Sequence, residues 1–260
     1  MAETLKIASQ GKGTPLVFIH GWGLNSGVWQ PLKTQLIDHF QVITVDLPGF
    51  GVNVKNELQD YSLANIVAEI GRVIEQPAVY IGWSLGGLIA TEIAYQHPEK
   101  VLALVTVASS PLFVESEDWP GIKPELLKGF HQQLAQDTQK TIDGFLKIQA
   151  MGSPNIRHDI KQLRALIMEY PMPTKNTLDQ SLQLLETIDL REKLSELRLP
   201  FLRLYGRLDS LIPKTIPALV TTLAPHSEQY IFAKASHAPF ISHPEEFLQI
   251  IESWLKTAVS

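Results

Sequence analysis

A serine, an aspartate and a histidine in three separate segments could together cleave a carboxylic acid derivative. Ser84 stands at the centre of a Gly-x-Ser-x-Gly pattern that runs from Gly82 to Gly86. A serine hydroxyl is a weak nucleophile unless a neutral histidine removes its proton, and that histidine needs a carboxylate to hold its ring. Asp209 and His237 follow later in the chain, each after a short apolar segment. Their order predicts a nucleophile, an orienting acid and a general base.

The segment around Ser84 predicts a strand, a sharp turn and a helix. Apolar residues 79–81 precede the pattern, and helical spacing follows it to residue 90. Such a turn strains the serine backbone, and Gly82 and Gly86 avoid clashes because they carry no Cβ. Backbone N–H groups at the start of a helix can hold a negative oxygen. We expect an oxyanion hole made by the N–H groups of Leu85 and of Trp22, which lies in the loop after residues 16–20.

His237 is the histidine best placed to act as the base, because it follows the last predicted strand. His20 also ends a strand, and we interpret it as a residue that orients the oxyanion loop. Surface or structural roles fit His39, His97 and His158, and a capping role fits His243. His226 precedes the last predicted strand, which places it on the wrong side of the sheet. For the acid, Asp46 lies in a turn sequence, where aspartate commonly binds its own backbone, and Asp189 is a third choice. We predict Asp209.

Alternating strands and helices must position these residues. Short apolar runs at 16–20, 41–45, 79–83, 101–107, 200–205 and 228–233 predict strands, and helical spacing at 28–40, 62–75, 216–223 and 244–254 predicts helices. Strands that are apolar on both faces are typical of a parallel sheet covered by helices. Between residues 112 and 188 the pattern is helical throughout, with helices expected after Asp137, after Ser153 and at 177–186. We predict an α/β core formed by residues 1–111 and 189–260, with 112–188 as a helical lid.

Composition limits the classes of function. The 260 residues are 45% hydrophobic, carry a formal net charge of −5 and include no cysteine. Disulfides and cysteine-based metal sites are therefore excluded, and the charge gives no case for nucleic-acid binding. No signal-peptide pattern and no membrane-length apolar run are visible, so we expect a cytoplasmic monomer without a metal or an organic cofactor.

Several motifs extend across the chain and resemble one known family. They lie at 20–25, 46–51, 82–87, 105–111, 119–124, 201–206 and 237–244. Together they resemble the α/β-hydrolase superfamily, and more closely its biotin-pathway family, the pimeloyl-[acyl-carrier protein] methyl ester carboxylesterases. The most specific runs are Trp-Pro-Gly-Ile-Lys-Pro at 119–124 and His-Ala-Pro-Phe-Ile-Ser-His-Pro at 237–244.

The resemblance implies a substrate and the residues that bind it. The substrate would be a methyl-capped seven-carbon acyl chain held as a thioester on an acyl-carrier protein, and the products would be methanol and the free acid. The implied substrate contacts are Trp22, Ser84, Leu85, Phe145, Leu146, Lys147, Ile148, Gln149 and His237. Phe145 and Gln149 share a helix face at positions i and i+4. Both the Trp22 ring and Phe145 could instead be ordinary core aromatics.

A basic stretch in the predicted lid fits an acidic carrier protein. Arg157, Lys161 and Arg164 recur at i, i+4 and i+7, beside an apolar face formed by residues 156, 160, 163 and 167. With Lys140 they predict a docking surface, although such a stripe alone is more often a solvated face. The family tends to carry arginine where this chain has Lys140 and Lys161, and a basic residue where it has Gly144. Lysine supplies the charge without the bidentate fork of arginine.

Other functions on the same scaffold stay open at this point. A generalist short-chain esterase, a thioesterase, a carbon–carbon hydrolase or a lyase would need the same fold, which does not define the reaction. The serine nucleophile argues against dehalogenase and epoxide hydrolase chemistry, which use aspartate at that position. A binding or signalling protein that has lost turnover would not need all three of Ser84, Asp209 and His237.

Overall fold

A central sheet organises the computed structural model, which describes residues 4–259. Its strand order within these residues is β1-β3-β2-β4-β5-β6-β7. The strands are β1 (Ile7–Gln10), β2 (Pro15–Ile19), β3 (Gln41–Val45), β4 (Ala78–Trp83), β5 (Val101–Val107), β6 (Phe201–Gly206) and β7 (Glu228–Phe232). β1 pairs antiparallel with β3, and the other described neighbours pair in parallel. The predicted α/β fold with a mostly parallel sheet is confirmed.

Strand β1 was not predicted, and its sequence explains why. Ile-Ala-Ser-Gln has one half-buried residue, Ile7, followed by three exposed ones. The strand is held at the sheet edge by pairing with β3, where Ile7 lies opposite Val45 and Gln10 opposite Val42. Backbone pairing at an edge needs no apolar run, so hydrophobic patterning gives no signal for it.

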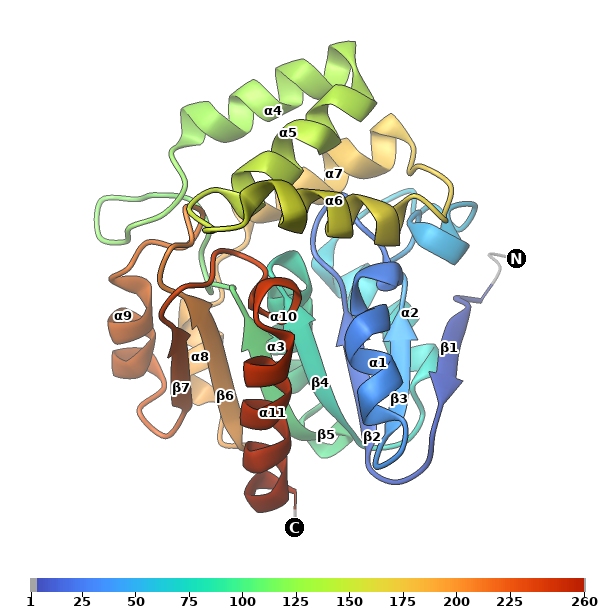
Figure 1. Ribbon diagram of the computed structural model, residues 1–260, viewed down its shortest axis with the longest axis vertical. Helices are drawn as coiled ribbons and strands as arrows, with labels where there is room; N and C mark the ends of the chain where they lie inside the picture. Colours follow the sequence, from blue (N-terminus) through green and yellow to red (C-terminus); the bar gives the residue numbers. More distant parts are fainter. Residues whose placement is uncertain (1–3, 260) are drawn as a thin grey trace.

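Helices cover both faces of the sheet (Figure 1). They are α1 (Gln30–Leu36), α2 (Leu63–Val73), α3 (Leu85–Gln96), α8 (Arg191–Glu196), α9 (Ile216–Leu223), α10 (Pro239–Ser242) and α11 (Pro244–Ala258). α1 contacts α11, whereas α3 contacts both α2 and α8. The single helix predicted over 28–40 is instead a 3₁₀ turn, Ser26–Trp29, followed by α1, whose first turn contains Pro31. Proline fits there because the first turn of a helix has no partner for its N–H.

Four more helices form a layer over the ends to which the parallel strands point (Figure 1). They are α4 (Pro124–Gln136), α5 (Thr138–Ala150), α6 (Ile156–Ile167) and α7 (Lys175–Thr187), and we call them the lid. α5 packs against α4 and α6, and α4 packs against α7. Asp137 caps α5 by accepting a hydrogen bond from Lys140 N at 2.9 Å. The chain enters and leaves this layer at one point, where Leu190 N donates to Pro111 O at 2.8 Å and Leu112 pairs with Asp189.

No helix among residues 4–259 combines the length and the apolar character that crossing a membrane would require.

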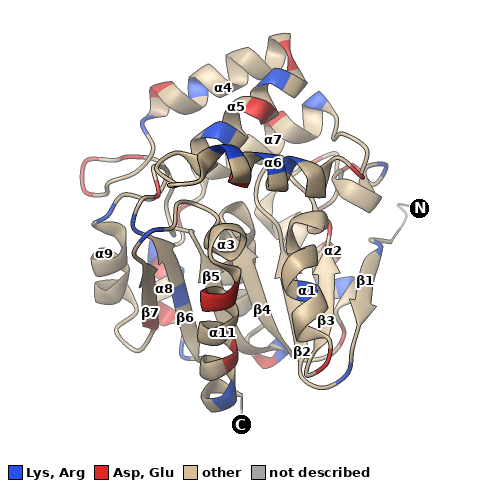
Figure 2. Cartoon of the chain, viewed as in Figure 1, with Lys and Arg blue, Asp and Glu red and all other residues tan. Residues whose placement is uncertain are grey.

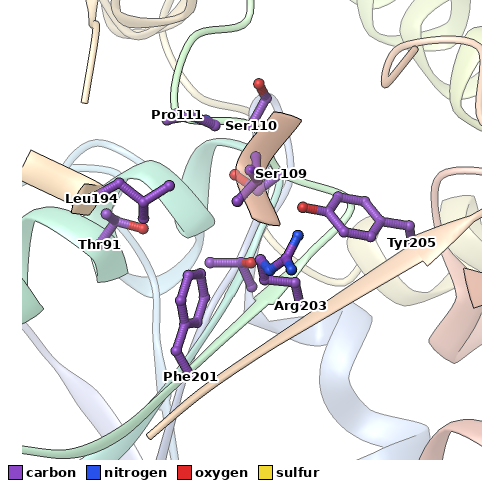
Figure 3. Close-up of a pocket in the computed structure, with 10 residues that line it drawn as sticks. Thr91, Ser109, Ser110, Pro111, Leu194, Phe201, Arg203 and Tyr205 are labelled. Carbon is purple, nitrogen blue, oxygen red and sulfur yellow. The ribbon is translucent and has the colours of Figure 1, made fainter. Parts of the chain in front are cut away.

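A buried arginine joins β6 to helix α9. Arg203 is 1% exposed, and its guanidinium donates to Ser227 Oγ at 2.9 Å, Pro217 O at 2.9 Å and Thr221 Oγ1 at 2.8 Å. Beside it lies a cavity of ≈ 10 Å³ that Tyr205 and Ser109 also line, and Figure 3 shows the Arg203 and Tyr205 side chains converging there. That volume suits about one water molecule, too little for an organic substrate. Burial raises the pKa of Tyr205, so its phenol stays neutral.

Replacing Arg203 with methionine is expected to lower the free energy of unfolding by about 2–4 kcal/mol, because buried acceptors lose their donors while the chain volume is nearly kept. Urea unfolding followed by circular dichroism measures this. Arg198→Met is the matched control, because Arg198 is exposed. An Arg203→Met midpoint equal to that of the control would show that the three hydrogen bonds add nothing to stability.

Candidate active site

Ser84 occupies the sharp turn between β4 and α3. Its backbone has φ 54° and ψ −116°, a region that residues other than glycine rarely adopt. A Cβ on Gly82 would lie 2.1 Å from Gly86 O, and one on Gly86 would lie 2.3 Å from Ile19 O. Both positions therefore require glycine. Ser84 N donates to Val107 O, and Ser84 O accepts from Ser109 Oγ, each at 2.9 Å. These bonds hold the strained turn in place.

His237 and Asp209 form a buried pair. His237 Nδ1 lies 2.7 Å from Asp209 Oδ2, while Asp209 Oδ1 accepts from the N–H groups of Leu211 at 2.8 Å and Ile212 at 3.2 Å. The carboxylate can only accept, so Nδ1 carries the proton and Nε2 presents a lone pair. Nε2 is buried and has no hydrogen-bond partner within residues 4–259. A neutral histidine in this tautomer can take a proton from a hydroxyl.

Trp83 brings the nucleophile turn and the base together, and sequence analysis missed it. Its indole N–H donates to His237 O at 2.8 Å, and the Trp83 and His237 ring centroids are 5.8 Å apart. Because Trp83 directly precedes Ser84, this bond places the His237 loop against the nucleophile turn. The available signal was its position as the last residue of a strand that leads into the serine.

The loop after β2 lies against Ser84, as an oxyanion loop must. A Cβ on Gly21 would be 3.4 Å from Ser84 Cβ. Leu85 is the first residue of α3, where a helix has no internal acceptor for its N–H. Trp22 follows Gly21, and its indole N–H donates to Leu178 O of α7 at 3.0 Å. Its ring packs edge-on against Phe145 at 4.8 Å, so Trp22 joins the core to the lid.

His20 and Asp46 support neighbouring backbone. Leu47 N–H donates to His20 Nε2 at 3.0 Å, so Nδ1 carries the ring proton and donates to Gly21 O at 2.8 Å. Burial lowers the pKa of His20 and keeps the ring neutral. Asp46 accepts from Ser26 N at 2.5 Å and Val52 N at 2.8 Å, the turn role predicted for it.

The other alternative acid, Asp189, binds Arg191 at 2.7 Å. Within the described chain His237 has its carboxylate contact with Asp209 alone. No group of three His, Asp or Glu side chains in that same part of the chain could hold a metal ion.

The predicted substrate segment of α5 divides between the buried and the exposed face. Phe145, Leu146 and Gln149 are buried, Ile148 is half-buried and Lys147 is exposed, so the structure does not bring Lys147 to the site. Lys147 lies two positions from both Phe145 and Gln149, which places it on the opposite side of the helix. Gln149 is 0% exposed, and within residues 4–259 neither its Oε1 nor its Nε2 has a partner. Gln149 O accepts from His237 N at 3.2 Å.

The predicted docking residues Lys140, Arg157, Lys161 and Arg164 are all exposed on the lid. Figure 2 shows basic positions gathered along α6, with further ones on α5. Arg164 lies 3.6 Å from Asp143, which offsets part of its charge. The predicted apolar face of α6 is buried at Leu163 and Ile167, half-buried at Ile160 and exposed at Ile156, which is 37% exposed.

Comparisons with known proteins identify the fold family. A model of the alpha/beta hydrolase fold matches residues 14–244. Among solved structures, an esterase from Exiguobacterium antarcticum is 23% identical, with a TM-score of 0.87 over 97% of this chain and 96% of that one. A bromoperoxidase from Bacillus anthracis is 20% identical, with a TM-score of 0.86 over 96% and 94%. An enol-lactonase from Burkholderia xenovorans is 15% identical, with a TM-score of 0.84 over 97% and 96%. The chain belongs to the alpha/beta hydrolase fold family.

Proposed function

We propose that this chain is a serine carboxylesterase that hydrolyses the methyl ester of a pimeloyl group carried on an acyl-carrier protein. The observation that carries the esterase assignment is the His237 to Asp209 contact of 2.7 Å, which leaves a buried, unpaired Nε2 beside the Ser84 turn. A neighbour in structure, from Exiguobacterium antarcticum, is described as an esterase. The finer substrate assignment rests on the family resemblance and on two features of the lid.

The proposed reaction has two halves. Ser84 Oγ attacks the ester carbonyl and gives its proton to His237 Nε2, while the N–H groups of Trp22 and Leu85 hold the negative oxygen. The intermediate collapses, and the methoxide leaves with the proton from His237 as methanol. Water then gives a proton to His237 and attacks the acyl group on Ser84. Collapse returns the proton to Ser84 Oγ and releases the acid.

The first supporting feature is an aromatic cluster that joins the loop after β2, next to Ser84, to the lid. Trp22, Phe145 and Phe130 pack together, with centroid separations of 4.8 Å between Trp22 and Phe145 and 5.6 Å between Phe130 and Phe145. Gln149 adds a buried amide whose N and O atoms have no partner among the described residues. An aromatic wall with one unsatisfied polar group suits an apolar acyl chain that carries a carbonyl. An unpaired buried amide is costly, so a bound carbonyl or hydroxyl would stabilise it.

The second supporting feature is the exposed basic stripe of α6. Arg157 and Lys161 have no ion-pair partner among residues 4–259. Ile156, which precedes Arg157, and Met151, which follows α5, are exposed as well. Cations around a small apolar patch fit an acidic partner surface that brings its own apolar residues. Carrier proteins have that character, and their long arm would carry the ester to the site beneath.

Reversing the charge of this stripe is expected to weaken action on the carrier-bound ester selectively. For Arg157→Glu with Lys161→Glu, kcat/KM for methyl pimeloyl-carrier protein should fall about 20-fold, mainly through KM, because two attractive contacts become repulsive. Hydrolysis of free dimethyl pimelate should stay within about twofold, because the stripe does not touch the reacting ester. Added salt should shrink the difference.

The matched control for this experiment is Lys100→Glu with Arg198→Glu. These residues precede β5 and β6, at the ends of the strands opposite the lid. If the control and the lid variant lose equal activity, the lid stripe is not a docking surface. If wild type hydrolyses free and carrier-bound esters equally well, the protein is a generalist esterase, which is the alternative function.

A further inference from the structure

The carboxyl end of lid helix α5 rests on the two loops that carry Asp209 and His237. Ser210 Oγ, next to Asp209, donates to Ile148 O at 3.1 Å. Ser236 Oγ, next to His237, lies 2.8 Å from Gln149 O and 2.6 Å from Met151 O, and its single proton is shared between them.

The backbone completes the same contact between α5 and the loops. His237 N donates to Gln149 O at 3.2 Å. Gly152 lies two residues after the end of α5 and has φ 89°, and a Cβ there would lie 2.6 Å from Leu208 O, so the chain meets the Asp209 loop too closely for a side chain.

These bonds supply hydrogen-bond partners for the carbonyl groups at the end of the helix. The last carbonyl groups of a helix have no partner within it and must be satisfied from outside. At the end of α5, Ile148 O accepts from Met151 N, and the carbonyls of Ile148, Gln149 and Met151 also accept from the hydroxyls of Ser210 or Ser236, which neighbour the orienting acid and the base. The end of the lid helix and the catalytic loops therefore satisfy one another, so a shift of either one breaks the same bonds.

The contact also governs access. Ser84 is 1% exposed and His237 and Gln149 are 0% exposed, so an ester can reach the reacting atoms only after the structure around them opens, and the end of α5 is part of that structure. α5 supplies both Phe145 over Trp22 and Gln149 beside His237. Movement of the carboxyl end of α5 away from the loops would break the bond between His237 N and Gln149 O, and its return would restore that bond.

We propose that Ser210 and Ser236 are positioning residues that hold the carboxyl end of α5 on the catalytic loops. Their hydroxyls hold the backbone of Gln149 against the backbone of His237 in the closed state and set the balance between the closed and the open lid. Neither hydroxyl touches the substrate. The inference rests on the proposed esterase function for its effect on turnover, whereas the latch itself is a property of the chain that is measurable without turnover.

Hydrogen–deuterium exchange tests the latch directly. Loss of one neutral hydrogen bond of ordinary strength changes an equilibrium about fivefold, so Ser210→Ala or Ser236→Ala should each speed exchange of amides 146–152 by about that factor, and the double variant more. Ser195→Ala is the matched control, because Ser195 Oγ also donates to a backbone carbonyl, Glu192 O, but lies in α8. Unchanged exchange at 146–152, or equal acceleration across the whole chain, would overturn the proposal.

Two rates separate positioning from a loss of folding. Labelling of Ser84 by a fluorophosphonate needs an open lid, so the double variant should label faster than wild type by about fivefold or more. Its kcat on a small ester should fall several-fold, because the backbone of the His237 loop is no longer held against the end of α5. Unlike Ser210→Ala, Ser210→Thr keeps a hydroxyl at this exposed position, so both of its rates should lie near those of wild type. A parallel fall of both rates would overturn the positioning role.

The labelling measurement and the exchange measurement test different claims, so either can fail while the other holds. If wild type is not labelled by the fluorophosphonate at all, Ser84 is not the nucleophile and the proposed function fails. The exchange rates of residues 146–152 would still decide whether Ser210 and Ser236 latch α5.

Discussion

Replacing Ser84 with alanine is expected to lower kcat for ester hydrolysis by at least about 10⁴-fold. The reason is that Ser84 Oγ is the atom that forms the bond to the acyl group, and no neighbouring group can take its place. Alanine keeps the Cβ and fits the same strained backbone at φ 54° as serine does. The fold should therefore persist, and a thermal unfolding midpoint near that of wild type would show that it does. Steady-state hydrolysis of a methyl ester and of an activated ester measures the loss.

The acyl-enzyme gives an independent check of the same prediction. Wild type mixed with an activated ester should show a rapid burst and a mass increase on the peptide that contains Ser84, and Ser84→Ala should show neither. Ser242→Ala is a suitable control, since Ser242 Oγ donates to Ala238 O at 3.3 Å in the helix after His237. If Ser84→Ala retains hydrolysis above one hundredth of wild type, another residue is the nucleophile.

The residues that bond formation requires could be predicted from sequence because each sits in a local pattern. Ser84 lies between two glycines at fixed spacing. A Cβ on either glycine would lie only 2.1 Å or 2.3 Å from a backbone oxygen, so both positions require glycine. Asp209 and His237 follow apolar strands, and the carboxyl ends of parallel strands meet at one edge of a sheet. The structure places these two side chains in contact at 2.7 Å.

The residues that arrange the site carry no such pattern. Trp83 binds His237 O across 154 positions of sequence, and Ser236 binds Gln149 O across 87. A single indole N–H or hydroxyl in a buried strand or loop looks like any other residue until the fold supplies its acceptor. Arg203 is similar: its charge in an apolar strand is explained by two acceptors on α9 and one in the loop before β7. Long-range polar contacts are therefore the part of this site that sequence patterns do not predict.

The two predicted surfaces of the lid show the same limit. A helical period indicates which positions share a face, and it groups Phe145 with Gln149 as the structure does. It does not indicate how much of each position the rest of the fold covers, so Ile156 in the first turn of α6 is 37% exposed although its period matches that of buried Leu163. An apolar position that the fold leaves uncovered becomes part of the outer surface and can serve a partner.

Replacing Asp209 with asparagine is expected to lower kcat by about 10⁴-fold with little change in KM. Asparagine Oδ1 can still accept from the N–H groups of Leu211 and Ile212, so the loop should keep its shape. Its amide N–H₂ would then face His237 Nδ1, which can only accept from it, and the ring proton must move to Nε2. A histidine in that tautomer cannot take the proton of Ser84. The measurement is kcat and KM on a small ester at neutral pH.

The controls for this prediction come from the two aspartates that sequence analysis kept as alternatives. Asp189→Asn should leave kcat within about threefold. Asp189 is an exposed carboxylate that pairs with Arg191 at the entrance to the lid and does not contact His237. Asp46→Asn should act mainly on stability, since Asp46 accepts from Ser26 N and Val52 N in a turn. If either of these variants loses more kcat than Asp209→Asn, the orienting acid has been assigned to the wrong carboxylate. If all three keep wild-type kcat, His237 does not need a carboxylate, and the catalytic geometry read from the contact of 2.7 Å is wrong.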